Sequence, residues 1–302
     1  MNLRKLEEVL MEGMAEAGEK TAKNFGVAKR LRDKKIEAPY ANPAAEALTE
    51  TDLENQETLL HHLYKSFPQV AISVEERIND PTPVQKSFYE NDESAEYLVQ
   101  IDPIDGTFIY AQGKIREYGI ITSVVERKTC DQGVFVFSII YYPSLEFFII
   151  ANHEKVAKIK RSGEITPLSK ETAPQCSRQE YSASFVDPPE KLGLPKEVPY
   201  VRDIYSATQA VLYVTNGRIP GYLKRNAQTI DALAAAWIAH QWGADVEFAS
   251  GEKLHSVPFG DIKTPEGRKL PRDQRGLLII GKKSDAYFKK YADAYQRHQG
   301  VS

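Results

Sequence analysis

Two carboxylates stand three residues apart in a segment whose other residues favour a bend. A predicted apolar strand leads directly into Ile101-Asp102-Pro103-Ile104-Asp105-Gly106-Thr107. Mg²⁺ takes oxygen ligands in near-octahedral geometry, and such a bend can offer it carboxylates together with a backbone carbonyl. The same Pro and Gly residues are also common in ordinary turns. The segment alone therefore leaves two interpretations open, a metal site and a plain turn.

Three further acidic residues favour the metal site. Glu75 and Glu76 end another predicted strand, where adjacent carboxylates repel each other unless a cation or solvent compensates. Asp231 opens the run Asp231-Ala232-Leu233-Ala234-Ala235-Ala236-Trp237. In that position it is either an ordinary acidic residue in the first turn of a helix or a ligand that faces the interior.

Taken together, these segments resemble the inositol monophosphatase-like superfamily of magnesium-dependent, lithium-sensitive phosphatases. The hallmarks of that family are a Glu-Glu pair, a DPxDGT turn and a later Asp that opens a helix of small residues, and the chain has all three in that order. The resemblance extends to Thr49-Glu50-Thr51-Asp52, similar to the family's Thr-x-x-Asp, and to Ser206-Ala207-Thr208. It spans residues from roughly 45 to 250.

The resemblance implies a role for each matching residue. The metal ligands would be Glu75, Asp102, the backbone oxygen of Ile104, Asp105 and Asp231. The catalytic residues would be Asp52, Glu76 and Thr107, with Asp52 taking the proton of the threonine. The substrate would be bound by Gly106, Thr107, Ser206, Ala207 and Lys224. The implied cofactor is Mg²⁺, two or three ions per site, with Mn²⁺ as an alternative. Such cations would remove the mutual repulsion of carboxylates that face one cavity.

Lys224 departs from the family's pattern. Inositol phosphatases carry a Glu seven residues before the late Asp, where it binds sugar hydroxyls, whereas this chain has Lys224 followed by Arg225. A cation at that place favours a substrate with a second anionic group, such as a bisphosphate, a nucleotide or a carboxylated sugar phosphate. The alternative is that Lys224 points into solvent.

Hydrophobic periodicity predicts the elements that position these residues in the first half of the chain. Helices are predicted at residues 3–17 and 51–67, the second beginning with Thr51-Asp52-Leu53-Glu54, a capping-box pattern. Segments rich in β-branched and aromatic residues predict a strand at 70–73 and an antiparallel meander at 97–101, 118–126, 133–142, 145–152 and 156–160. Residues 77–96 have turn composition and predict an exposed loop.

The second half alternates strand and helix patterns, which indicates an α/β arrangement. Strands are predicted at 181–185, 200–204, 244–248 and 277–280, and helices at 207–215, 231–242 and 284–298. A polar stretch suggests two sub-domains within a single phosphatase unit of residues 1–302. Residues 1–165 would carry the meander and most ligands, and residues 166–302 would carry Asp231 and the substrate-side residues. The resemblance implies a layered αβαβα sandwich of the mixed α+β or α/β class.

Composition excludes several classes of function. The chain of 302 residues has 39 Lys and Arg against 42 Asp and Glu, and this net charge of −3 argues against a nucleic-acid polymer as partner. No stretch approaches the roughly 20 apolar residues of a membrane span, and the charged start lacks the apolar core of a signal peptide. A cytoplasmic protein that does not enter the membrane is therefore expected.

These observations predict a Mg²⁺-dependent phosphoric monoester hydrolase that acts on a small soluble metabolite by attack of an activated water molecule. The candidate substrates are an inositol phosphate, a sugar phosphate or bisphosphate, and a nucleotide bisphosphate. The alternative is a catalytically inactive regulatory protein of the same fold that binds a phosphorylated metabolite. Such a protein would have no reason to keep every ligand and Thr107. Family members are often dimers, so the resemblance also implies a homodimer.

Overall fold

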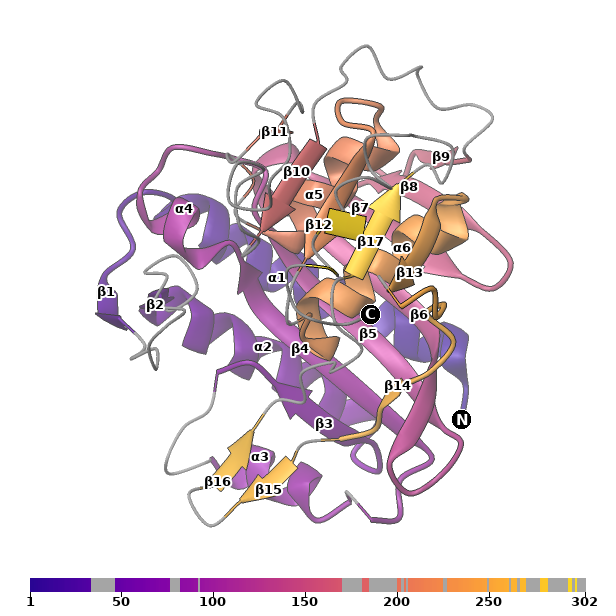
Figure 1. Ribbon diagram of the computed structural model, residues 1–302. Coiled ribbons are helices and arrows are strands. Elements are labelled where there is room, and N and C mark those ends of the chain that lie inside the picture. Colours follow the sequence, from indigo (N-terminus) through magenta and orange to yellow (C-terminus); the bar gives the residue numbers. More distant parts are fainter. Residues whose placement is uncertain are drawn as a thin grey trace.

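The computed structural model describes residues 1–33, 47–76, 82–91, 93–169, 181–184, 200–201, 204, 206–224, 227–248, 250–260, 262–264, 267–269, 278–281, 293–294 and 297. Over these residues the chain forms stacked layers of helix and sheet (Figure 1). Helices α1 and α2 cover one face of a large sheet, and α5 and α6 lie between its other face and a second, smaller sheet. The mixed α/β fold class is therefore confirmed.

The first layer consists of α1 (Leu3–Asn24) and α2 (Glu50–Ser66). In α1, apolar residues recur every three or four positions, so that one side packs against α2 and the sheet. Both helices were expected, but the predicted capping box at Thr51 is wrong. The N-cap of α2 is Thr49, and its backbone N–H donates to Asp52. Thr49 has the extended backbone that an N-cap requires, whereas Thr51 already lies inside the helix.

The large sheet has eight strands among the described residues. In spatial order they are β3 (Ala71–Val74), β4 (Tyr97–Asp105), β5 (Gly119–Arg127), β6 (Gln132–Tyr142), β7 (Phe147–Asn152), β8 (Val156–Lys160) and β9 (Ile165–Pro167), and β14 (Val257–Pro258) also pairs with β6. The strand β3 is parallel to β4, and the pairs from β4 to β9 are antiparallel. The antiparallel meander is thus confirmed.

Side chains of this sheet alternate between two apolar cores. In β5, Ile120 and Val124 pack in the core with α1 and α2, whereas Ile121 and Val125 pack in the core that contains α5 and α6. Asp102 of β4 lies directly opposite Ile121. Because cross-strand partners share a face, Asp102 belongs to the side of the sheet where α6 lies.

The second half supplies the other layers. Between the sheets lie α5 (Ala207–Thr215), a π-helical turn η4 (Thr229–Leu233) and α6 (Ala234–Trp242), which is almost wholly buried. Over the described residues, the second sheet has five strands in the order β11 (Tyr200–Val201), β10 (Tyr181–Ser184), β12 (Gly221–Lys224), β17 (Leu278–Gly281) and β13 (Asp245–Phe248). The helix predicted at residues 284–298 lies mostly outside the described residues.

Small elements complete the described chain. They are β1 (Arg30–Asp33) paired with β2 (Ala47–Thr49), β15 (Ile262–Thr264) paired with β16 (Gly267–Lys269), the helices α3 (Pro83–Tyr89) and α4 (Thr107–Ala111), and the 3-10 turn η2 (Pro143–Leu145). The prediction of a loop over residues 77–96 is wrong where α3 forms. There Thr82 and Gln85 make a capping box, Pro83 occupies the first turn, and Phe88 is buried.

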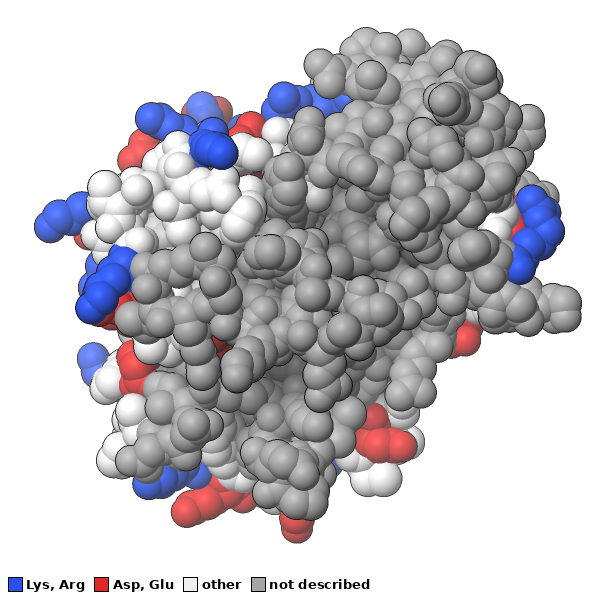
Figure 2. Space-filling model, turned by 60° about the vertical axis from the view of Figure 1, so that its left-hand side comes forward, with Lys and Arg blue, Asp and Glu red and all other residues white. Residues whose placement is uncertain are grey.

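Two element boundaries near the acidic residues also differ from the prediction. The strand β4 continues to Asp105 instead of ending at Ile101. The helix expected to open at Asp231 begins two residues earlier, as the π-helical turn η4. None of the helices in the described part of the chain is long and apolar enough to cross a membrane. On the face drawn in Figure 2, blue and red side chains are interspersed among the described residues.

Candidate active site

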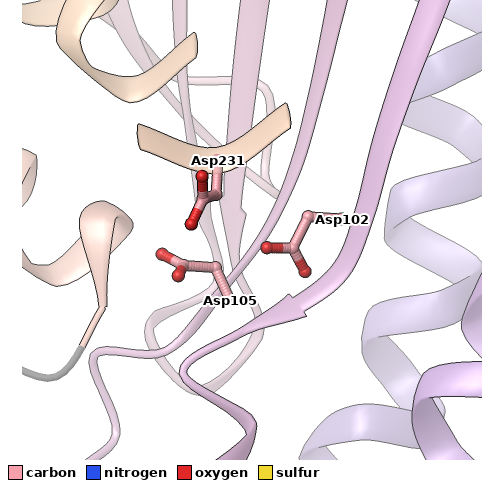
Figure 3. A group of neighbouring side chains, drawn as sticks. All are labelled: Asp102, Asp105 and Asp231. Atoms are coloured by element: carbon pink, nitrogen blue, oxygen red, sulfur yellow. The ribbon is translucent and has the colours of Figure 1, made fainter. Parts of the chain in front are cut away.

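Three aspartates from separate parts of the chain meet beside the large sheet. One carboxylate oxygen from each of Asp102, Asp105 and Asp231 lies within 4.8 Å of the other two. Figure 3 shows the three carboxylates turned toward one another, the first two from β4 and the third from η4. Asp102 and Asp105 expose only 2% and 7% of their surface. The structure thus brings together, in this aspartate cluster, three of the five predicted metal ligands, and their role stays a prediction.

An irregularity in β4 explains how two of these side chains share a face. Residues three apart in a regular strand point to opposite faces. The register of β4 against β5 shifts between Asp102 and Asp105, which is the effect of a bulge. Within the bend, the backbone N–H of Ile104 donates to Oδ1 of Asp102 at 3.0 Å. The bend therefore directs the carboxylates of Asp102 and Asp105 to the same face of β4.

Asp231 reaches the cluster from a wide turn of helix. It lies in the π-helical turn η4, and its Oδ1 accepts a hydrogen bond from the backbone N–H of Ala232. Such turns inside helices are frequent at functional sites, because they displace a side chain from regular helical positions. The small residues that follow, Ala234, Ala235 and Ala236, are all buried and let α6 pack closely between the sheets.

The start of α5 adjoins Asp105. The backbone N–H of Thr208 donates to Oδ2 of Asp105 at 2.5 Å, and Ser206 caps the helix by accepting from the N–H of Gln209. Gly106 has a φ of 96°, and a Cβ on it would lie 3.0 Å from Cβ of Ser206. The predicted substrate-side residues Gly106, Ser206 and Ala207 therefore lie beside the aspartate cluster, although their roles stay predictions.

Burial and mutual repulsion make the cluster costly to ionise. Burial raises the pKa of Asp102 well above its ordinary value, and the charges of Glu75 and Asp105 raise it further. Burial also raises the pKa of Asp105 to about 6, with the charge of Asp231 adding to the shift. The pKa of Asp231 is raised by burial as well. A nearby cation would therefore favour full ionisation of the cluster.

The glutamate pair ends β3 next to the cluster. The N–H of Glu75 donates to the carbonyl of Ile101 at 3.0 Å and so continues the pairing of β3 with β4. Glu75 also contributes to the raised pKa of Asp102, which indicates that its carboxylate is nearby. Glu76 is buried, and its backbone is bonded to the side chain of Gln56. The structure thus places Glu75 beside β4 and Glu76 beside α2.

Asp52 and Thr107 are in direct contact. Oγ1 of Thr107 lies 2.9 Å from Oδ1 of Asp52 and 2.7 Å from the carbonyl oxygen of Ile104. The other oxygen of Asp52 accepts from the N–H of Thr49 at 2.8 Å. Asp52 is fully buried, and burial raises its pKa to about 6, despite these hydrogen bonds. The contact that the resemblance implied is therefore present.

Lys224 does not point into solvent. It is the last residue of β12 and exposes only 8% of its surface. Its charge opposes the rise in the pKa of Asp231 and of Asp105, which indicates that the ammonium group faces the aspartate cluster. The solvent-exposed alternative is wrong because the strand directs this side chain inward. Arg225 lies outside the described residues.

Two residues on α2 that contact the site were not predicted from the sequence. Asn55 donates to the carbonyl of Pro103 at 3.2 Å, and Gln56 bonds to the backbone of Glu76. A signal for them exists in the sequence. Together with Asp52 they fall at spacings of three and four, on the same buried side of α2 as Leu59. Polar residues at positions of an apolar stripe indicate specific hydrogen bonds.

A match to a known sequence profile shows to which family the chain belongs. The sequence profile of the inositol monophosphatase family matches residues 2–292 of the chain. The chain belongs to the inositol monophosphatase family. Members of this family are metal-dependent phosphatases, and in this member the buried aspartate cluster offers oxygen ligands that could bind a metal.

Solved structures of this family share the fold. A Thermotoga maritima IMPase has a TM-score of 0.66 at 19% identity and covers 99% of each chain. The extragenic suppressor protein suhB from Bartonella henselae has a TM-score of 0.63 at 17% identity, over 97% of this chain and 99% of that one. An IMPase/NADP phosphatase complexed with NADP and Ca²⁺ has a TM-score of 0.62 at 14% identity, over 97% and 96%. No curated protein sequence matches the chain.

Proposed function

We propose that this inositol monophosphatase family member is a Mg²⁺-dependent phosphomonoesterase that hydrolyses a small soluble phosphate ester. The observation that carries the proposal is the buried aspartate cluster, with the Asp52–Thr107 pair at the bend from which two of its carboxylates project. Family membership supports a metal-dependent phosphatase as the class of activity. Magnesium, the substrate and the roles of individual residues are parts of the proposal. So are inhibition by lithium, a cytoplasmic location and a homodimer.

The donor set suits Mg²⁺ or Mn²⁺. The proposed ligands all offer oxygen, and they are Glu75, Asp102, the carbonyl of Ile104, Asp105 and Asp231. The raised pKa values of the three aspartates fit a site that holds cations, because burial and mutual repulsion disfavour the charged carboxylates and Lys224 offsets only part of this effect. When bound, two or three such cations would polarise the phosphoryl group and offset the charge that develops on the leaving oxygen.

Thr107 and Asp52 would move the proton of the attacking water. The Thr107 hydroxyl holds one proton and has two acceptors, Oδ1 of Asp52 and the carbonyl of Ile104. As Thr107 Oγ1 accepts a proton from water, its own proton passes to Oδ1 of Asp52. A pKa of about 6 suits Asp52 for this role, because such a carboxylate is largely ionised at neutral pH yet accepts a proton readily. The proposed role of Glu76 is to help orient the same water.

Lys224 would recognise a second anionic group on the substrate. It is buried and faces the aspartate cluster, so a phosphate ester bound there would lie within reach of its charge. A sugar bisphosphate, a nucleotide bisphosphate or a carboxylated sugar phosphate carries such a group, whereas a simple inositol monophosphate does not. Gly106, Ser206 and Ala207 would bind the substrate beside the aspartate cluster, and the backbone N–H groups of Gly106 and Thr107 would approach the phosphate.

The test is phosphate release from a panel of inositol, sugar and nucleotide esters. Release should require Mg²⁺, stop when a chelator is added, and fall when lithium is added as a competitor. Asp105→Asn should abolish release, whereas Asp131→Asn, in the exposed turn between β5 and β6, should leave it unchanged. Absence of release from every ester would contradict the proposal and favour the non-catalytic binding protein.

A further inference from the structure

One face of α2 carries polar side chains where apolar ones would be expected. Asp52, Asn55 and Gln56 have no exposed surface, and they lie on the side of the helix that packs against β4. Burying an amide without hydrogen bonds costs several kcal/mol in an apolar environment, so buried amides in native proteins are normally bonded. The hydrogen-bond partners of the Asn55 and Gln56 side chains therefore indicate the role of this face of α2.

The side chain of Gln56 pairs with the backbone of Glu76 in both directions. Its Nε2 donates to the carbonyl of Glu76 at 2.7 Å, and the N–H of Glu76 donates to its Oε1 at 3.1 Å. The two bonds join one amide to both polar groups of one residue, as a neighbouring strand would. They begin one residue beyond the last backbone bond from β3 to β4, which the N–H of Glu75 makes.

Glu75 is thereby fixed on both sides. The sheet holds the peptide group before it, through the bond to Ile101, and Gln56 holds the peptide group after it, through the N–H of Glu76. Because both peptide planes are held, the backbone dihedral angles of Glu75 are restricted. The direction in which its side chain leaves the backbone is therefore fixed. The neighbouring residue Asn55 holds the other side of the site, because its Nδ2 donates to the carbonyl of Pro103.

We propose that Gln56 is a positioning residue that sets the place of Glu75 relative to the aspartate cluster. It does so by extending the backbone pairing of β3 with its side-chain amide, while Asn55 anchors the bend that carries Asp102 and Asp105. The inference rests on the proposed metal site. Residues that orient metal ligands typically change metal affinity 10–100-fold when they are replaced.

The experiment compares two glutamines that are equally buried. Gln56→Met keeps the side-chain length and removes both bonds to Glu76. Gln85→Met is the matched control, because Gln85 is also buried and also accepts from a backbone N–H, but it serves α3 and contacts Thr82 and Glu57. Mn²⁺ affinity of each metal-free protein is measured by electron paramagnetic resonance, at a temperature where circular dichroism shows both variants folded. If Gln56→Met does not fold, Gln56→Asn is measured in its place, because it keeps an amide at this position.

We expect Mn²⁺ affinity to fall at least about tenfold in the Gln56 variant and to stay at the wild-type value in Gln85→Met. Phosphate release by the Gln56 variant should recover as Mg²⁺ is raised at a temperature where circular dichroism shows the metal-free variant already folded, so that stabilisation by the metal does not account for the recovery. Equal Mn²⁺ affinities in both variants would overturn the positioning role and leave the proposed function standing. Failure of the wild-type protein to bind Mn²⁺ would overturn both.

Discussion

At the scale of single residues, the proposed proton transfer depends on the hydrogen bond between Thr107 and Asp52. Asp52→Asn preserves the shape of the side chain but removes the base, so we expect kcat to fall about 10²–10⁴-fold. Mn²⁺ affinity should be unchanged, because Asp52 is not a proposed ligand. In the wild-type protein kcat should rise with pH through about 6, where Asp52 loses its proton. An unchanged kcat in Asp52→Asn would contradict this role.

Substitutions of Lys224 test substrate selectivity, also at the scale of single residues. Lys224→Met removes the charge without adding another carboxylate to the cluster. A charge-assisted hydrogen bond contributes roughly 1.5–3 kcal/mol, so kcat/KM for a doubly anionic ester should fall about tenfold or more relative to an ester with one phosphate. Lys224→Arg, which keeps the charge, is the control. Steady-state rates for both substrates provide the measurement, and an equal loss for both would rule out selective recognition.

At the scale of elements, the strong patterns were predictable and the details of the site were not. The periodicity of α1 and α2 and the β-branched and aromatic composition of β5 and β6 are features of the local sequence, and the structure confirms the helices and strands that they predict. The register shift in β4 and the π-helical turn at Asp231 depend on contacts with distant elements, so no local pattern signals them. The capping box of α2 was predicted at the wrong residue because Thr49 and Thr51 both match the pattern. Only the path of the chain from β2 distinguishes the two.

Gly106, at the start of α4, lies close to Ser206, at the start of α5, and this contact gives a prediction at the scale of elements. An alanine there would hold a left-handed backbone and press its Cβ to within 3.0 Å of Ser206. Gly163 has a similar φ of 89° but nothing within 4 Å of an added Cβ, so Gly163→Ala isolates the backbone cost of about 1–2 kcal/mol. Gly106→Ala should lower the free energy of unfolding by more than Gly163→Ala does. Urea denaturation of both variants measures this, and equal losses would show that the contact with Ser206 is unimportant.

At the scale of the whole molecule, one site joins elements of both halves and links metal binding to stability. In the folded protein, the pKa of Asp52 and of Asp105 is raised from 3.8 to about 6. Between these values the unfolded chain loses protons that the folded protein keeps. The free energy of unfolding of the metal-free protein should therefore fall as pH rises from about 4 to 6.

Thermal denaturation in the presence of a chelator, at several pH values in this window, measures that dependence. Mn²⁺ should reduce the loss, because cations take over the compensation that protons provide at low pH. Asp105→Asn should also show a weaker dependence, since it removes one of the titrating groups. A midpoint temperature that rises with pH in the metal-free protein would contradict the raised pKa values.

Every role proposed for a residue of this site depends on divalent cations binding to the aspartate cluster. The most direct measurement is a titration of the metal-free protein with Mn²⁺, in which free Mn²⁺ is followed by electron paramagnetic resonance and the wild type is compared with Asp231→Asn. We predict saturable binding by the wild-type protein and much weaker binding by the variant. Wild-type protein that leaves Mn²⁺ free, or a variant that binds it equally well, would contradict the account.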